Sequence, residues 1–184
     1  MTRLHHAVPA LIIIFAMAAC GGDTTSPGEE DFTGSFTVTV SGDFTGSYEG
    51  EAFFGEATNS DGDPVWVLFM GTDGSSDDMV LYFVREGARP GQGSHAMVDV
   101  QSADSLSAGD LGGYMSVGAG NSTVVVFSTA GSLVVSESTG SLMEGDFNIQ
   151  AAGTQLSDGM ATDVSVTITG SYSAPSGTVN WPGF

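Results

Sequence analysis

Residues 35–54, SFTVTVSGDFTGSYEGEAFF, alternate between two kinds of side chain over almost their whole length. Successive side chains of a β-strand point to opposite faces, so this alternation predicts a strand with one buried and one solvated face. One straight strand over residues 36–54 would be about 60 Å long, too long for a domain of this size. The glycines are therefore predicted to mark a bend, a bulge or a hairpin that keeps the phase. The predicted buried face carries Phe36, Val38, Val40, Gly42, Phe44, Gly46, Tyr48, Gly50, Ala52 and Phe54.

Further strand patterns follow along the chain, and no stretch shows a helical period. The segments between them hold turn residues, notably at 60–64, 72–75, 120–121, 130–131 and 139–140. Short strands without helical crossovers predict an all-β fold, an antiparallel up-and-down meander of about 8–10 strands. Both a β-sandwich and a closed barrel fit this prediction. The predicted strands cover residues 65–71, 79–85, 95–101, 113–118, 123–128, 132–138, 145–151 and 163–172.

The first and last strands resemble each other. Residues 37–45 read TVTVSGDFT and residues 165–173 read SVTITGSYS, as expected if the sheet closes with these strands side by side. Two unrelated strands rich in Val and Thr would look the same. In a closed sheet, inward aromatic residues would either line an apolar ligand cavity or fill the core, for example Phe44, Tyr48, Phe54 and Trp66.

The loops of a meander alternate between the two ends of its sheet. The turns at 59–64 and 86–94 are predicted to share one end, which brings Arg85 and Arg89 near Asp61 and Asp63. The loops at 72–78, 102–111 and 152–162 are predicted to share the other end. That end would gather six acids and no cation: Asp73, Asp77, Asp78, Asp104, Asp110 and Asp158.

Residues 1–19 have one cation, Arg3, followed by an apolar stretch that closes with small residues, as in a secretory signal. Met17-Ala18-Ala19-Cys20 resembles the lipobox of bacterial lipoproteins. The resemblance implies diacylation of the Cys20 thiol, cleavage before it and acylation of the new amine. The membrane would then be a partner through these acyl chains, since each buried methylene adds about 0.8 kcal/mol. The alternative is an ordinary signal peptide with an incidental Cys20.

The predicted organisation is a lipoprotein signal peptide at 1–19, a lipidated Cys20 with a flexible tether at 20–33, and a single β-sandwich or barrel domain at 34–184. The expected product is an exported, membrane-anchored protein. Gly21 and Gly22 follow Cys20 where enteric bacteria place an Asp for inner-membrane retention, so the outer membrane is the expected site. Its periplasmic and surface faces both stay open.

The chain is strongly acidic. Its formal net charge is −19, and the only charged side chain of residues 1–19 is Arg3, so residues 20–184 hold all 22 acids against Arg85 and Arg89. Such a charge repels nucleic acid and anionic headgroups, so nucleic acid is not an expected partner. An envelope protein or a small molecule remains a candidate partner.

Few residues offer catalytic chemistry. His95 is the only histidine beyond residue 19, and no Gly-x-Ser-x-Gly elbow is present, so no enzyme is expected. Paired carboxylates of a glycosidase-like envelope hydrolase are the alternative, because the many acids offer pairs. Calcium is the candidate inorganic ligand, through oxygens at Asn59, Asp61 and Asp63 and a second acidic turn at Asp73, Asp77 and Asp78. Hairpin turns without metal favour the same residues.

Residues 131–151 carry Gly131-x-Leu133, a turn, and Leu142-x-x-Gly145-x-Phe147. This resembles a hairpin of small bacterial β-rich lipoproteins of unknown function, whose final strand ends in a Gly-aromatic pair such as Gly170 and Tyr172. The resemblance supports a fold family and implies no activity. The expected function is that of a lipid-anchored cell-envelope protein with a non-enzymatic binding or structural role. A lipophilic-ligand carrier is a further alternative if the barrel is hollow.

Overall fold

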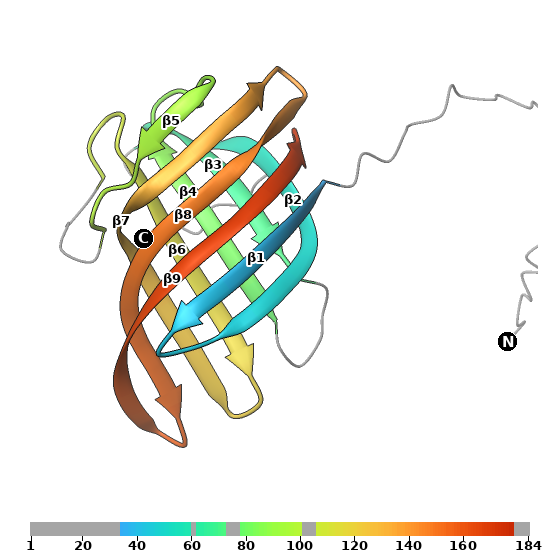
Figure 1. Ribbon diagram of the computed structural model, residues 1–184. Helices are drawn as coiled ribbons and strands as arrows, with labels where there is room; N and C mark the ends of the chain where they lie inside the picture. The colour runs from blue at the N-terminus through green and yellow to red at the C-terminus, as the bar shows by residue number, and fades with distance from the viewer. Residues whose placement is uncertain (1–33, 60–61, 73–77, 101–105, 179–184) are drawn as a thin grey trace, which may run out of the picture. The chain divides into compact units, whose positions relative to one another are not determined.

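A computed structural model describes residues 34–59, 62–72, 78–100 and 106–178. Within these ranges no helix is long and apolar enough to span a membrane. The described chain is built from strands (Figure 1). They are β1 (Ser35–Gly42), β2 (Gly46–Thr58), β3 (Pro64–Gly71), β4 (Met79–Glu86), β5 (Gly93–Ala96), β6 (Leu111–Ala119), β7 (Ser122–Ser138), β8 (Leu142–Ser157) and β9 (Met160–Pro175).

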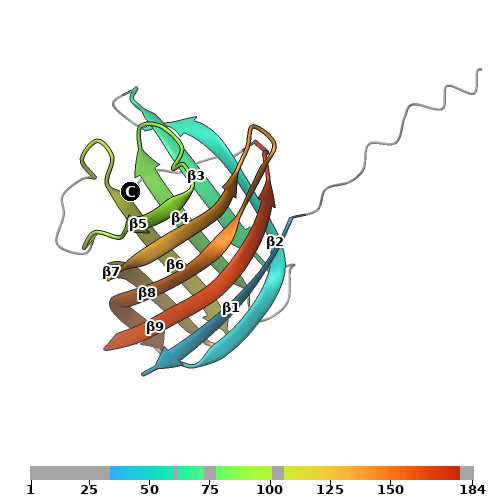
Figure 2. The same ribbon diagram turned by 45° about the horizontal axis from the view of Figure 1, so that its top comes forward.

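Eight of these strands form a closed, antiparallel ring. Its order is β1-β2-β3-β4-β6-β7-β8-β9, and β9 pairs with β1 to close it. β5 stands outside this order and pairs with β7 alone. Figures 1 and 2 show β8, β9 and β1 on one side of the ring and β3, β4 and β6 on the other. The all-β, antiparallel meander is confirmed, and its closure resembles a barrel.

The opening stretch folds as the alternation requires. A hairpin joins β1 to β2 in a register that sets Val40 opposite Gly46, so both strands keep the same phase. Phe36, Val38 and Val40 on β1, and Ala52 and Phe54 on β2, are buried. Of the bend, bulge or hairpin predicted for this stretch, the structure has the hairpin, and it keeps the phase.

The predicted pairing of the first and last strands is also confirmed. β1 and β9 run antiparallel with Thr37 opposite Ser171 and Thr39 opposite Thr169. Asp43 fixes the far end of this pair. Its carboxylate accepts a hydrogen bond from the Ser165 amide at 2.9 Å, and its own amide donates to the Ser165 carbonyl at 3.1 Å.

The interior of the ring is packed with large apolar side chains from the strands around it. Phe83 and Phe147 meet edge to face across the core, with ring centroids 5.1 Å apart. Burying each such side chain stabilises the fold by about 1.5–3 kcal/mol. The largest fully buried residues are Trp66, Phe83, Leu68, Met70, Met79, Leu81, Leu111, Met115, Leu133, Met143, Ile149 and Ile168.

One predicted turn is wrong. Residues 123–128 and 132–138 belong to a single strand, β7, and Ala130-Gly131 lies inside it. The register against β8 shifts between Ser128 and Ala130, which marks a β-bulge, and Gly131 has φ +131°. A bulge with a glycine bends a strand without reversing it, and the sequence signal for the two is the same.

Because of the bulge, β7 pairs with two different strands, β6 and β5, along the same edge. Its first part pairs with β6 through Phe127, and its later part pairs with β5 from Ser132 onward. The predicted strand at 95–101 is therefore wrong in extent, since β5 ends at Ala96. Beyond it, the amides of Met97, Val98 and Val100 donate singly to carbonyls of Gly131, Leu111 and Ser128.

One loop lies at a different end of the sheet from the one predicted. The turn after β4 returns to Pro64, whose carbonyl accepts from the Gly87 amide, so 59–64 and 86–94 share an end as predicted. Because β5 does not cross the ring, the chain reaches β6 at this same end, where the Gly109 amide donates to the Glu86 carbonyl. We call the end that holds Arg85 and Arg89 the arginine end. Asp110 therefore lies at the arginine end, and its predicted place among the acids of the other end is wrong.

The loop predicted at 152–162 is much shorter. β8 and β9 continue to a two-residue turn at Asp158-Gly159, with φ values of +51° and +79°. Two positive φ values match the twist of a tight hairpin, and Asp-Gly adopts them readily.

Candidate functional site

A row of five aromatic side chains crosses the outside of the ring. Its members are opposite one another in register on β2, β3, β4, β6 and β7. The row spans four strand spacings, about 19 Å. We call it the aromatic row, and it consists of Phe53, Phe69, Tyr82, Tyr114 and Phe127.

Each ring of the aromatic row contacts the next. The centroids of Phe53 and Phe69 are 4.7 Å apart, and those of Phe69 and Tyr82 are 5.1 Å apart and edge to face. Tyr82 and Tyr114 are 6.2 Å apart, and Tyr114 and Phe127 are 5.4 Å apart. All five side chains are half-buried. Such pairs add about 0.5–1.5 kcal/mol each beyond their area burial.

The wall that carries the row is apolar toward the arginine end. Val65, Val67 and Val84 point outward and are nevertheless buried, with Leu106 packed against them. Gly112 makes room for this covering chain, because a Cβ there would lie 2.7 Å from a methyl carbon of Val100. The segment that follows β5 thus covers part of the outer wall and leaves the row itself half-exposed.

The opposite wall is rich in hydroxyl groups. β1 and β9 present Ser or Thr at successive outward positions, and the Thr37 and Ser171 hydroxyl oxygens are 3.0 Å apart. On β8 the Glu144 carboxylate accepts from the Ser173 hydroxyl at 2.9 Å. A shallow polar hollow of about 250 Å³ lies over these residues. The outside of the ring therefore has one aromatic wall and one hydroxyl wall.

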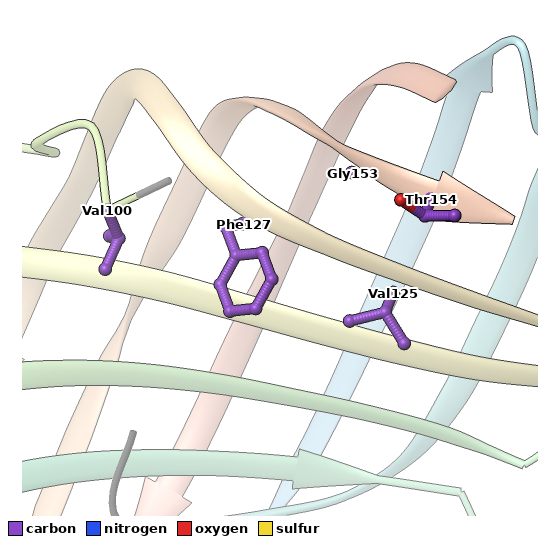
Figure 3. Close-up of a pocket in the computed structure, with 5 residues that line it drawn as sticks. All are labelled: Val100, Val125, Phe127, Gly153 and Thr154. Carbon is purple, nitrogen blue, oxygen red and sulfur yellow. The ribbon is translucent and has the colours of Figure 1, made fainter. Parts of the chain in front are cut away.

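A second hollow of about 220 Å³ lies at the Phe127 end of the row. Figure 3 shows Val125 and Phe127 side by side on β7, with Val100 next to Phe127 and Thr154 on β8. Three apolar side chains and one hydroxyl suit an apolar group with a single polar atom.

Burial also acts on the phenol in the middle of the row. It raises the pKa of Tyr82 above its ordinary value, and the neighbouring Tyr114 raises it further. Tyr82 therefore stays uncharged at neutral pH. The row provides apolar contact area with polar tips, which suits binding.

The predicted calcium ligands are only partly described. The side-chain oxygen of Asn59 accepts a hydrogen bond from the backbone amide of Asp63 at 2.8 Å, and the backbone amide of Asn59 donates to the Asp63 carbonyl at 2.9 Å. The side-chain oxygen of Asn59 therefore stabilises the turn in which it lies. Asp61 lies outside the described residues.

The second acidic turn is described only at Asp78, which is exposed and whose carbonyl accepts from the Gly118 amide. Asp73 and Asp77 lie outside the described residues, as does Cys20. In the described part of the chain, no three His, Cys, Asp or Glu side chains gather in a metal-binding group. Calcium binding and lipidation stay predictions.

The cations donate to backbone carbonyls at the arginine end. Arg85 donates to Gly109 and Ala88, and Arg89 donates to Thr139 while its guanidinium lies 5.3 Å from the centroid of the Phe54 ring. The His95 ring nitrogen lies 2.7 Å from the Gly91 carbonyl oxygen. These groups tie the loops of this end to the barrel.

Sequence reasoning missed the aromatic row. Phe53 falls on the face of the opening stretch that otherwise carries polar residues. Residues 65–71 and 79–84 are nearly continuous apolar runs, which is typical of strands covered on both faces. These two signals could have revealed an apolar outer wall. The pairing of the five rings requires the register, which no local pattern provides.

Comparison of the chain with protein-family models, curated proteins and solved structures gave no match.

Proposed function

We propose that this chain is a lipid-anchored, non-enzymatic binding protein of the bacterial cell envelope. The observation that carries the proposal is the placement of aromatic side chains around the ring. The interior is packed with buried apolar side chains, whereas the outer wall holds a continuous half-exposed aromatic row. The rings of this row offer contact area to a partner.

The filled interior favours outer binding over a carrier role. Trp66 and Phe54, which would line an internal cavity, belong to the main core cluster, and Phe44 and Tyr48 pack against it. A ligand would have to displace well-packed side chains, which costs several kcal/mol per side chain moved.

The hollows also favour binding over hydrolysis. Glycoside cleavage needs two carboxylates about 5–10 Å apart across a cleft. The hollow at Phe127 is lined by no carboxylate, and the polar hollow is lined by one, Glu144. The hydrolase is therefore the weaker proposal.

The anchor is tested in a two-membrane bacterium that makes the full chain. A mass spectrum of the purified product should show cleavage before Cys20 and an acylated first residue, with the protein in the detergent-soluble membrane fraction. Cys20→Ser should abolish acylation.

A matched control moves the cysteine without changing the composition. The double variant Cys20→Ser with Ser26→Cys keeps one thiol six residues further on, and it should remain unacylated. An unmodified Cys20 in the wild-type product would refute the anchor, and acylation of the moved thiol would show that the surrounding motif has no role.

A further inference from the structure

We propose that the aromatic row docks on the surface of a zwitterionic lipid bilayer. This inference deepens the proposed function and rests on it, because the anchor at Cys20 would hold the domain beside that surface. The row lies flat on the interface and does not span the bilayer.

The chemistry of the row suits a membrane interface. Phe and Tyr rings combine an apolar body with, in Tyr, a polar tip, and aromatic rings collect at the level of lipid headgroups. Tyr82 and Tyr114 stand in the middle of the row, with Phe53 and Phe127 at its ends. Val80 and Val125 flank it on the neighbouring outward positions, opposite Ser116 on β6.

The distribution of charge points the same way. On β3, β4 and β6 the outward positions hold a single carboxylate, Glu86 at the end of β4. At the β2 edge of the row, Glu49 and Glu51 share the outer face of the strand with Phe53, and Asp146 lies further round the ring on β8. Moving a carboxylate out of water is costly, so the part of the wall on β3, β4 and β6, away from Glu86, is the part that can enter an interface.

The shape of the wall distinguishes a bilayer from a second copy of this chain. The row covers five of the eight positions of a closed ring, so its surface is convex. Two convex walls meet along a narrow line, whereas a stable dimer buries about 800 Å² on each partner. The soft headgroup region of a bilayer yields to a convex body over a depth of about 5–10 Å.

The proposed tether removes the need for high affinity. Residues 20–33 span at most about 50 Å when fully extended. Anchoring through Cys20 would give the row an effective concentration in the millimolar range near the lipid. A weak surface interaction is then enough to orient the domain.

The test uses residues 20–184 with Cys20→Ser, so that no acyl chain contributes. This background is free of cysteine, because Cys20 is the only one in the sequence. A single cysteine is introduced at Ser116→Cys, beside the aromatic row, or at Thr39→Cys on the hydroxyl wall, and is labelled with an environment-sensitive fluorophore. Phosphatidylcholine vesicles at millimolar lipid should shift the emission at position 116 to the blue and leave position 39 unchanged.

Two further comparisons sharpen the result. Phe127→Thr should lower vesicle partition of the chain labelled at position 116 about tenfold, since it removes one apolar side chain from the contact. Thr167→Ala on the hydroxyl wall is the matched control and should leave partition unchanged. Near-ultraviolet circular dichroism confirms that each variant is folded. Anionic vesicles should bind more weakly, because the chain is acidic.

Several outcomes would overturn the proposal. These are no shift at either position, equal shifts at both, or stronger binding to anionic vesicles. A blue shift of the emission at position 116 that appears without lipid and grows with protein concentration would show that a second copy of this chain covers the aromatic row. None of these results bears on the anchor, because the tested chain is not acylated.

Discussion

The Ser128 hydroxyl lies 3.0 Å from the Gly113 amide nitrogen, from which it accepts a hydrogen bond. It donates in turn to the Val98 carbonyl at 2.9 Å. Ser128 is buried and sits where β7 leaves β6 and begins to pair with β5. One side chain thus satisfies two backbone groups at the point where the regular ladder of the ring is interrupted.

Ser128→Ala should destabilise the fold by about 2 kcal/mol, because it leaves the buried Gly113 amide and the half-buried Val98 carbonyl without this partner. Urea unfolding should show a lower midpoint with an unchanged slope. The matched control is Ser94→Ala on β5, where the side chain is exposed and the change should stay within about 0.5 kcal/mol. A similar midpoint for both variants would show that the Ser128 hydroxyl is dispensable.

Gly131→Ala should destabilise the fold by more than about 2 kcal/mol. Gly131 has φ +131°, and a Cβ there would lie 2.3 Å from the Asn148 carbonyl oxygen on the paired strand β8. Both the backbone angle and the contact oppose any side chain. Gly140→Ala, in the β7–β8 turn with open space around it, is the control and should change stability by less than about 0.5 kcal/mol. Thermal unfolding measures both, and a tolerated Gly131→Ala would mean that the bulge relaxes.

The β-bulge that contains Gly131 also marks the limit of what the sequence predicts. Alternation in residues 35–54 predicted the phase of β1 and β2, and the echo between residues 37–45 and 165–173 predicted the closing pair. Both signals can be found in the sequence without knowledge of the register. The bulge at Ala130-Gly131 carries the same residues as a turn, so it was predicted as one. The bulge also lets β5 pair outside the ring order. Because the prediction had this strand cross the ring, it placed Asp110 at the wrong end of the sheet.

The binding wall lay beyond sequence reasoning for another reason. Each member of the aromatic row has a partner from another strand, and pairs such as Tyr82 and Tyr114 are far apart along the chain. Only the register of the closed ring places them together. The acidic turn at Asn59, in contrast, has a local role. Its side chain accepts a hydrogen bond from the Asp63 amide within the turn, and a turn of this kind was the alternative to calcium that the sequence offered.

The aromatic row should behave as a chain of coupled pairs. A double-mutant cycle of Phe69→Ala and Tyr82→Ala should give a coupling energy of about 0.5–1.5 kcal/mol, because their rings meet edge to face at 5.1 Å. Phe53→Ala and Tyr114→Ala lie three strand spacings apart and share no neighbouring ring, so they should be additive within about 0.5 kcal/mol. Equal coupling in both cycles would indicate a general loosening of the wall in place of ring contact.

Tyr172→Phe should leave the fold equally stable at neutral pH or stabilise it by up to about 1 kcal/mol. The Tyr172 hydroxyl is buried inside the ring, close to Gly145, and has no hydrogen-bond partner among the described residues. A buried hydroxyl without a partner costs free energy on folding, and the substitution removes that cost.

The same substitution should change the response to alkali. Burial raises the pKa of Tyr172 well above its ordinary value, and the nearby Asp146 carboxylate raises it further. Below about pH 10 the phenol is neutral in both the folded and the unfolded chain, so its contribution is constant. Above about pH 10 the unfolded chain loses this proton while the folded chain retains it, and the free energy of unfolding falls by up to about 1.4 kcal/mol per pH unit.

Urea unfolding at about pH 7 and about pH 11 measures this difference. Wild type should lose more stability than Tyr172→Phe between the two, and Tyr82, whose pKa is also raised, accounts for part of the loss that both proteins share. Asp146→Asn is the control that keeps the buried phenol, and it should retain most of the wild-type loss because burial is the larger cause. An equal alkaline loss in wild type and Tyr172→Phe would place the Tyr172 hydroxyl in contact with water.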